Sequence, residues 1–419
     1  MDTYADYSAL TVTSLPQRLA NVDPVLSIVG GRPEHWNVCE VGDGNLNLVF
    51  IVSGEKGAVI VKQALPYVRL VGESWPLPLY RAFYEYHALT RQALRDPGRV
   101  PSVVHFDERQ ALMAMEYLTP HVVLRRKLIK GERVENLGRD IGAFCARTAF
   151  RGSELSLASA EKKADVSLFA GNVAIPAITE ALVFADPYFN AAMNKHTPGL
   201  DPIVAALRRD VALKARVQKM LMRFASNTET MVHGDLHSGS IMATASEARV
   251  IDPEFAQYGP MAFDLGMLIA NYMMAYFSQP AHRGTGLVDY QDWILSVISE
   301  TVVNFESEFR HLWQTERTGM LFPRVLFEDQ GHDSTQACTD LLRDIRVDAL
   351  TFCGIEMHRR CLSLAHNADF EDISDIALRA SLEARNLLMG RELIMTAEQL
   401  TDTDAVLRLL RVFNERTVL

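Results

Sequence analysis

The chain has 419 residues, of which 48% are hydrophobic and 22% are charged. This length is enough for two or three lobes with a large core, and the composition is that of an ordinary globular enzyme. A net charge of −10 argues against a nucleic-acid partner, because there is no excess of basic residues to neutralise phosphates.

The early part of the chain is predicted to consist mainly of strands. Residues 38–62 read as a strand, a glycine-rich turn and two further strands. The last two strands, 49–52 and 58–61, flank Gly54-Glu-Lys-Gly57, a hairpin signal. The remaining elements predicted here are a helix over 77–94 and short strands over 103–104 and 111–115.

The rest of the chain is predicted to be mostly helical. Apolar residues recur with helical spacing over 134–150, 201–225, 261–278, 290–312, 336–366 and 373–415. Two strand-like stretches, around residues 231 and 250, interrupt this part. Strands followed by helices predict an α+β fold, with a small β-rich lobe over 1–118, a large helical lobe over 119–419, and the active cleft between them.

Cysteine usage and hydropathy predict a cytoplasmic protein with no membrane partner. The five cysteines have no Cys-x-x-Cys spacing, which is typical of free thiols in a reducing compartment and gives no zinc site. The N-terminus carries no secretion signal. The most apolar stretch, 261–277, contains Asp264 and is too short to cross a bilayer comfortably. We interpret the basic run Arg125-Arg126-Lys127, with Lys130, as one solvated helix face.

Three carboxylates in residues 231–254 carry the strongest functional signal. Asp235 follows a short apolar stretch within His233-Gly-Asp235, and Asp252 and Glu254 end the next one. Kinase active sites have this layout, with a catalytic Asp followed by a metal-binding Asp on the next strand. Asp235 is therefore the predicted catalytic carboxylate, and Asp252 the predicted Mg²⁺ ligand.

One position departs from the protein-kinase pattern. Ser240 stands where protein kinases place a metal-binding Asn, and a hydroxyl is a weak ligand for Mg²⁺. Glu254 is predicted to supply the missing oxygen, because residues i and i+2 of an extended segment point the same way. His233 and Asp264 are expected to brace the loop, whereas the role of His237 stays open.

Residues near the N-terminus indicate nucleotide binding. The segment Gly42-Asp43-Gly44-Asn45-Leu-Asn47 lies between strands, where glycines let the backbone approach phosphates, although it is also a good hairpin turn. Lys62 ends the following strand, where protein kinases place a phosphate-binding lysine. Its predicted partner is Glu85 in the next helix, with Glu73 as the alternative. No P-loop motif is present.

Together these motifs resemble the S-methyl-5-thioribose kinase family, within the aminoglycoside phosphotransferase and choline kinase-like superfamily. The resembling residues run in family order: Gly42 to Asn47, His233-Gly-Asp235-Leu-His-Ser-Gly-Ser240, Asp252-Pro-Glu254-Phe, and Tyr258 to Asp264. The resemblance implies a bilobal protein-kinase-like fold, ATP and Mg²⁺ as cofactors, and a homodimer. It also implies a hinge that reads the adenine edge, formed by Glu116, Tyr117 and Leu118.

The same resemblance implies the substrate side. Arg359-Arg360 resembles the family's twin arginine that reaches into the active site, and Trp75 resembles its tryptophan-bearing loop. The residues alone leave open that one arginine lies on the surface and that Trp75 packs in a proline-rich connection. Positive charge suits a neutral sugar that becomes a phosphate ester, and it would repel an aminoglycoside.

The implied reaction is in-line phosphoryl transfer from ATP to the anomeric 1-hydroxyl of methylthioribose, in methionine salvage. Asp235 would accept or orient the hydroxyl proton, while Arg359 and Arg360 stabilise charge on the transferring group. The alternatives are another small-molecule kinase of this fold, acting on an aminoglycoside, choline or homoserine, and a nucleotide-binding pseudokinase, which only Ser240 suggests.

Overall fold

The computed structural model describes residues 3–42, 46–68 and 72–416, which form two compact units. The first unit takes in the chain up to His121 together with Asn172–Ile175 and Arg249–Ala256. The second unit comprises Val122–Gly171, Pro176–Ala248 and the chain from Gln257 onward. The first unit therefore receives two short segments from later in the chain, and one of them carries Asp252 and Glu254.

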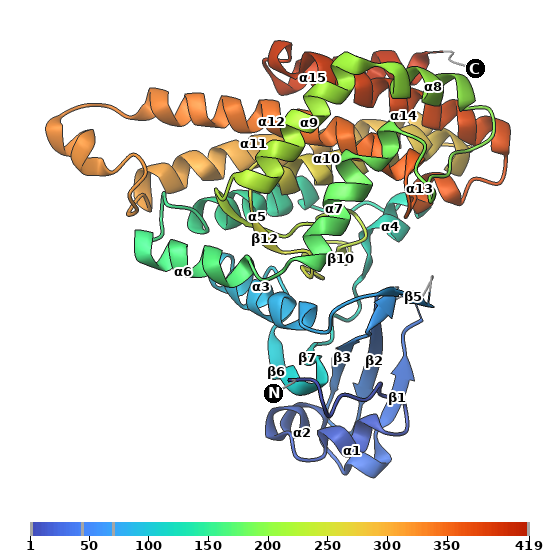
Figure 1. The fold of residues 1–419 in the computed structure, drawn as a ribbon, viewed down its shortest axis with the longest axis vertical. Coiled ribbons are helices and arrows are strands. Elements are labelled where there is room, and N and C mark those ends of the chain that lie inside the picture. Colours follow the sequence, from blue (N-terminus) through green and yellow to red (C-terminus); the bar gives the residue numbers. More distant parts are fainter. Residues whose placement is uncertain (1–2, 43–45, 69–71, 417–419) are drawn as a thin grey trace. The chain divides into compact units, whose positions relative to one another are not determined.

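The first unit is built on a five-stranded antiparallel sheet (Figure 1). Its order is β1 (Asn37–Glu40), β2 (Asn47–Ser53), β3 (Ala58–Ala64), β7 (Leu112–Glu116) and β6 (Val103–Asp107). The predicted hairpin is confirmed: Gly54 N donates to Gly57 O at 3.0 Å, and Ser53 pairs with Ala58. A second, small hairpin joins β4 (Tyr67–Val68) to β5 (Gly72–Pro76).

Alternation along the strands places one face of this sheet in a core. Phe50 and Val52 of β2 are buried, as are Val59 and Val61 of β3, which is the period-two pattern of a half-buried strand. The same core receives apolar side chains from two N-terminal helices that the sequence analysis did not predict, α1 (Leu15–Leu19) and α2 (Asp23–Val29). Two single 3-10 turns, η1 (Pro33–His35) and η2 (Glu108–Gln110), complete this part.

Helix α3 (Arg81–Arg95) belongs to the first unit and begins four residues after the predicted start at 77. It buries residues at helical spacing, namely Arg81, Ala82, Glu85, Ala88, Leu89, Gln92 and Arg95. The buried stripe thus contains three charged side chains. Buried charges require partners, so this helix face indicates a polar site within the unit.

The second unit is mostly helical. Its helices are α4 (Leu124–Lys130), α5 (Leu137–Arg151), α6 (Ser159–Phe169), α7 (Ala174–Phe184, which begins in the first unit), α8 (Asp201–Arg209), α9 (Val211–Ser226), α10 (Phe263–His282), α11 (Leu287–Thr315), α12 (Thr335–Leu362), α13 (Ala368–Glu371), α14 (Ile376–Thr396) and α15 (Thr403–Glu415). Single 3-10 turns are η3 (Asp186–Tyr188), η4 (Arg324–Leu326), η5 (Glu328–Gln330) and η6 (Ala397–Gln399). The predicted α+β fold, with strands concentrated early and helices late, is confirmed.

Two predicted helices are each interrupted by an aspartate. The segment expected over 201–225 breaks between α8 and α9 at Asp210, whose side chain accepts a hydrogen bond from Leu213 N. The segment expected over 373–415 breaks before Asp402, which caps α15 by accepting from Ala405 N. In both cases a side-chain oxygen satisfies a free amide at a helix start, so a new helix begins there.

Short strands carry the loops of the second unit. Strand β9 (Thr230–Val232) pairs antiparallel with β12 (Gln257–Gly259), and β10 (Ile241–Ala243) pairs with β8 (Val122–Val123). Strand β11 (Ala248–Val250) lies where the chain passes from the second unit to the first. The strand-like stretches predicted around residues 231 and 250 are thereby confirmed.

Helix α12 is packed closely between two neighbours. A Cβ atom placed on Gly266 of α10 would lie 2.5 Å from Ala349 O of α12, and one placed on Gly354 of α12 would lie 2.3 Å from Gly390 O of α14. Only glycine permits such backbone approach. These contacts hold α12, which bears Arg359 and Arg360, in a set position within the second unit.

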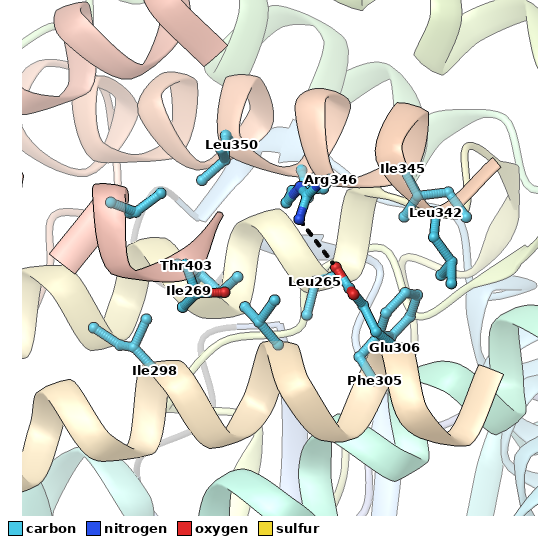
Figure 2. A pocket seen from close by; sticks show the side chains of 13 residues that line it. Leu265, Ile269, Ile298, Phe305, Glu306, Leu342, Ile345, Arg346, Leu350 and Thr403 are labelled. Carbon is cyan, nitrogen blue, oxygen red and sulfur yellow. Dashed lines mark hydrogen bonds and ion pairs between the residues drawn. The ribbon is translucent and has the colours of Figure 1, made fainter. Parts of the chain in front are cut away.

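One small, mostly apolar pocket lies between α10, α11, α12 and the start of α15 (Figure 2). Arg346 and Glu306 form an ion pair of 3.5 Å at this pocket. Its volume of about 30 Å³ is near that of one water molecule, so it is a packing gap in the helical core and not a ligand site.

Among the described residues, no single helix has the length and apolar character needed to cross a bilayer, although α6 and the stretch Ala174–Tyr188, bent by 81°, meet the criteria as a pair.

Candidate active site

The first unit holds Lys62 in a cluster of carboxylates. Lys62 Nζ lies 2.8 Å from Glu85 Oε1 on α3, and it also forms an ion pair with Asp252. Burial by itself would lower the pKa of Lys62, but Asp252, Glu85 and Glu254 raise it above its ordinary value, so the ammonium is charged. Lys62 thus pairs with Glu85, as predicted, whereas the side chain of the alternative, Glu73, lies outside the described residues.

Glu85, Asp252 and Glu254 together form a carboxylate site suited to a divalent cation. Each offers an oxygen, and these oxygens lie within 4.8 Å of one another. Burial raises the pKa of Glu85 to about 7, although the positive charge of Lys62 acts to lower it. Carboxylate oxygens are the ligands that Mg²⁺ prefers, and the Asp252 side chain is 46% exposed, which leaves it accessible. The donor set therefore fits Mg²⁺.

The backbone at Asp252 differs from the extended segment that the sequence suggested. Asp252 has φ of +70°, in the left-handed region that a non-glycine residue rarely adopts. The approach of Asp252 to Glu254 is therefore the product of a turn and not of strand alternation. Such backbone strain clusters at functional sites, where the surrounding structure maintains it.

Glu254 is held by residues of the N-terminal half. Asn47 Nδ2 donates to Glu254 Oε2 at 3.2 Å, and Arg81 Nε lies 3.5 Å from the same oxygen. Arg81 is fully buried and donates to Leu65 O and Pro78 O. Arg81 was not among the residues predicted for the site. A signal was present, because a cation in the first turn of a helix opposes the helix dipole and needs another reason to be there.

Other residues predicted to bind nucleotide also belong to the first unit. The Glu116 carboxylate accepts from Ser102 N at 3.0 Å and from Arg249 Nη2 at 2.9 Å, which fixes the end of β7. Tyr117 and Leu118 follow it directly. Trp75 lies on β5 and is partly buried. Of the predicted phosphate loop, Gly42 and Asn47 are described, whereas Asp43, Gly44 and Asn45 lie outside the described residues.

The second unit carries Asp235 in a braced loop after β9. Asp264, in the first turn of α10, accepts hydrogen bonds from His233 N at 2.6 Å and Gly234 N at 3.0 Å. Ser240 Oγ donates to Asp235 O at 2.9 Å. The predicted bracing role of Asp264 is confirmed. The Ser240 hydroxyl thus hydrogen-bonds to the backbone of this loop.

His237, whose role the sequence left open, contacts the Asp235 carboxylate. Its Nδ1 accepts hydrogen bonds from Gly239 N at 2.8 Å and from Arg125 Nη2 at 3.1 Å, since both of these groups can only donate. Nδ1 is therefore the acceptor nitrogen, and Nε2 carries the proton that points to Asp235 Oδ2 at 3.2 Å. Burial, with Arg360 and Arg125 nearby, lowers the pKa of His237 to about 3, so the ring is neutral at pH 7.

Arg360 holds the other oxygen of Asp235, with Nη2 lying 3.1 Å from Oδ1. Burial would raise the pKa of Asp235, but His237, Arg360 and Arg359 hold it well below its ordinary value. Asp235 is thus an ionised carboxylate with a weak tendency to take up a proton. Its geometry suits orienting a hydroxyl group more than removing a proton early in the reaction.

Arg359 and Arg360 are both buried, with exposures of 8% and 5%, so the alternative that one of them lies on the surface is excluded. The interpretation of Arg125-Arg126-Lys127 as a solvated face is wrong for two of the three residues. Lys127 is buried, and Arg125 lies 3.4 Å from Asp369 Oδ2 and contacts His237. A run of charges does not reveal partners that lie far away in the chain.

Comparison with known proteins first defines the class. A model of the phosphotransferase enzyme family matches residues 37–293, a range that includes Lys62, Asp235, Asp252 and Glu254. This match makes the chain a member of the phosphotransferase enzyme family.

Full-length relatives define the particular family. The chain is 41% identical to methylthioribose kinase of Escherichia coli O45:K1 (strain S88 / ExPEC), over 97% of this chain and 98% of the relative. It is 36% identical to methylthioribose kinase 2 of Oryza sativa subsp. japonica, over 90% of each chain. It is 40% identical to methylthioribose kinase of Geobacillus thermodenitrificans (strain NG80-2), over 88% of this chain and 89% of the relative. The chain belongs to the methylthioribose kinase family, and it is an ATP-dependent kinase of a small molecule.

Likeness to solved structures is weaker. A glucosamine kinase in complex with glucosamine, ADP and inorganic phosphate is 14% identical, with a TM-score of 0.45, over 84% of this chain and 81% of that chain.

Proposed function

We propose that the protein transfers the γ-phosphoryl group of ATP to the anomeric 1-hydroxyl of S-methyl-5-thioribose, which gives S-methyl-5-thioribose 1-phosphate and ADP within methionine salvage. The observation that carries the proposal is the pairing of Asp235 with Arg360, in a chain related over almost its whole length to methylthioribose kinases. A carboxylate next to a fixed cation suits a hydroxyl acceptor that gains a phosphate.

In the nucleotide half, Lys62 binds the α- and β-phosphates and Glu85 keeps the ammonium in place. Asp252 and Glu254 would hold Mg²⁺, which would supply positive charge to the phosphate oxygens. The segment from Gly42 to Asn47 covers the phosphates with backbone amides, and Asn47 fixes the Glu254 carboxylate. Backbone groups of Glu116, Tyr117 and Leu118 read the adenine edge.

In the acceptor half, Asp235 accepts a hydrogen bond from the 1-hydroxyl and orients its oxygen for in-line attack. The low pKa of Asp235 makes it a weak base. A weak base suffices, because an anomeric hydroxyl is more acidic than an ordinary alcohol and the transition state of phosphoryl transfer is loose. The proton moves to Asp235 as the new P–O bond forms. Arg359 and Arg360 stabilise the charge on the transferring group.

The remaining assignments belong to the same proposal. Trp75 contacts the sugar. The protein acts in the cytoplasm as a homodimer, without a nucleic-acid or membrane partner. The cations next to Asp235 disfavour an aminoglycoside or choline as acceptor, because a cationic substrate would be repelled at the catalytic carboxylate.

A coupled ADP-release assay tests the proposal with five acceptors: methylthioribose, ribose, choline, homoserine and kanamycin. We expect ADP release that depends on methylthioribose and exceeds the rate with every other acceptor. Faster turnover of choline or kanamycin would contradict the assignment of the substrate. ATP binding without release of ADP for any acceptor would favour a pseudokinase instead.

A further inference from the structure

The two adjacent arginines of α12 share one buried carboxylate. Glu356 lies three residues before Arg359 and four before Arg360, and residues at these spacings meet on a helix surface. Its Oε1 lies 3.5 Å from Arg359 Nη1 and 2.5 Å from Arg360 Nε. Glu356 is 0% exposed. Neighbouring residues of a helix point in different directions, so this carboxylate is what draws both guanidinium groups together.

The two arginines are bound to very different extents. All three nitrogens of Arg360 donate hydrogen bonds. Nε donates to Glu356 Oε1, Nη2 to Asp235 Oδ1 at 3.1 Å, and Nη1 to Ala365 O at 3.4 Å. Arg359 makes the one long contact with Glu356. Its Nε is buried and has no hydrogen-bond partner within the described part of the chain. A buried donor without a partner is costly, and a ligand oxygen is one way to satisfy it.

We propose that Glu356 is a positioning residue for phosphoryl transfer, and that the two arginines divide their roles. Glu356 acts through Arg360, which it orients against Asp235, so that Arg360 aligns the catalytic carboxylate. Arg359, whose side chain is 10% exposed, is the arginine that donates hydrogen bonds to oxygens of the acceptor or of the transferring phosphoryl group. This inference rests on the proposed function, since Asp235 is taken there as the catalytic carboxylate.

Replacement of Glu356 should disturb catalysis through the charge and the alignment of Arg360. In Glu356→Gln the side chain keeps its shape, but the negative charge shared by the two guanidinium groups is lost. The amide oxygen can still accept from Arg360 Nε, but the bond loses the negative charge that strengthens it, so the hold of Arg360 on Asp235 loosens. Residues that orient a catalytic group through another residue typically contribute roughly 10- to 100-fold in activity.

A double-mutant cycle tests this division. We expect Glu356→Gln and Arg360→Lys each to lower kcat/KM for methylthioribose by roughly 10- to 100-fold. The kcat/KM of the double variant should be no more than about twofold below that of the less active single variant, because both changes remove the same alignment. Glu356→Gln combined with Arg359→Lys should come much closer to the product of the two separate losses, because Arg359 makes only a long contact of 3.5 Å with Glu356. KM for ATP should stay within about twofold of the unaltered protein throughout, since Lys62 and Glu85 are unchanged.

A matched control is available on α14. Glu383 is also buried, contacts Arg379 Nε at 3.2 Å, and has a buried Oε2 without a hydrogen-bond partner among the described residues. Glu383→Gln makes the same chemical change away from Asp235, and it should leave kcat/KM unaltered. Thermal melting of every variant separates loss of alignment from loss of fold. Should Glu356→Gln unfold, Glu356→Asp, which keeps the charge but withdraws the oxygen, replaces it in the cycle.

Two results would overturn the inference: independent, multiplying losses for Glu356→Gln and Arg360→Lys, or equal losses for Glu356→Gln and Glu383→Gln. Failure of the proposed function is a separate outcome. It would show as absence of methylthioribose-dependent ADP release in the unaltered protein, and the cycle would then be measured with whichever acceptor the protein phosphorylates.

Discussion

His237 Nε2 lies 3.2 Å from Asp235 Oδ2, and the neutral His237 ring donates a hydrogen bond from Nε2 to that oxygen. Since Arg360 holds the other oxygen at 3.1 Å, the carboxylate is fixed from both sides. A carboxylate that is held in one orientation can orient a hydroxyl group without first losing rotational freedom. Such pre-organisation contributes much of the rate enhancement in phosphoryl transfer.

Asp235→Asn should nearly abolish turnover and leave ATP binding largely intact. The amide keeps the shape of the side chain but loses the charge, and groups in this role typically contribute about 10² to 10⁴-fold to the rate. The phosphate-binding residues of the first unit are unchanged in this variant. The measurements are kcat by ADP release and ATP affinity by calorimetry. A variant that retained more than roughly a tenth of the original kcat would show that Asp235 is not the catalytic carboxylate.

Glu254→Gln should raise the Mg²⁺ concentration needed for half-maximal activity more than Ser240→Ala does. Glu254 lies in the three-carboxylate cluster, whereas the Ser240 hydroxyl donates to Asp235 O. Carboxylate is the better ligand for Mg²⁺. Titration of Mg²⁺ at fixed ATP decides between them, with melting temperatures as a control for folding. Equal shifts, or a larger shift for Ser240→Ala, would refute the idea that Glu254 replaces the usual asparagine.

Arg359 and Arg360, each changed to Lys and to Ala, should lower kcat/KM for methylthioribose in all four variants. Lys should rescue only in part, because it lacks the planar fork that grips two oxygens. Melting temperature should fall more for Arg360→Ala than for Arg359→Ala. Loss of Arg360 leaves the buried Glu356 without its closest partner, and breaking a buried pair costs about 3–5 kcal/mol. Unchanged kinetics, or losses that unfolding explains, would reopen the choice of a cationic acceptor.

His358→Gln should make the stability of the protein less sensitive to acid. His358 is buried, and burial lowers its pKa to about 4, whereas an unfolded histidine has a pKa of about 6.5. Below pH 6.5 the unfolded chain therefore binds a proton that the folded chain does not. As the pH is lowered from 6.5 to about 4, the free energy of unfolding decreases. This contribution is about 2 kcal/mol at pH 5.

Urea unfolding of both proteins at pH 7.5 and pH 5 checks the sign. His358→Gln should be the less stable protein at pH 7.5, because Tyr188 and Leu387 lose their partner. Its deficit should shrink by about 2 kcal/mol at pH 5, where only the original histidine carries the protonation cost. All other titrating groups are shared and cancel in the difference. A deficit of the same size at both pH values would contradict the assignment.

Local patterns in the sequence determined the elements and the order of the chemistry. The hairpin of β2 and β3 follows from period-two alternation around Gly54 and Gly57, and both are visible within a short window. The sequence also predicted Lys62 with Glu85 as its partner, with Glu73 left as the alternative, and Asp235 ahead of Asp252 and Glu254, because these residues belong to local motifs. It failed for α1 and α2, where the helices are too short to show a period.

Only the tertiary structure decided which charges meet. Asp235 and Arg360 are 125 positions apart, Asn47 and Glu254 are 207 apart, and Arg125 reaches His237 across 112 positions. The energy of a charged side chain depends on whether burial is matched by a partner, and burial is set by the packing of whole helices. For that reason Arg125 resembled a surface charge in the sequence, yet in the fold it contacts His237, which in turn contacts Asp235.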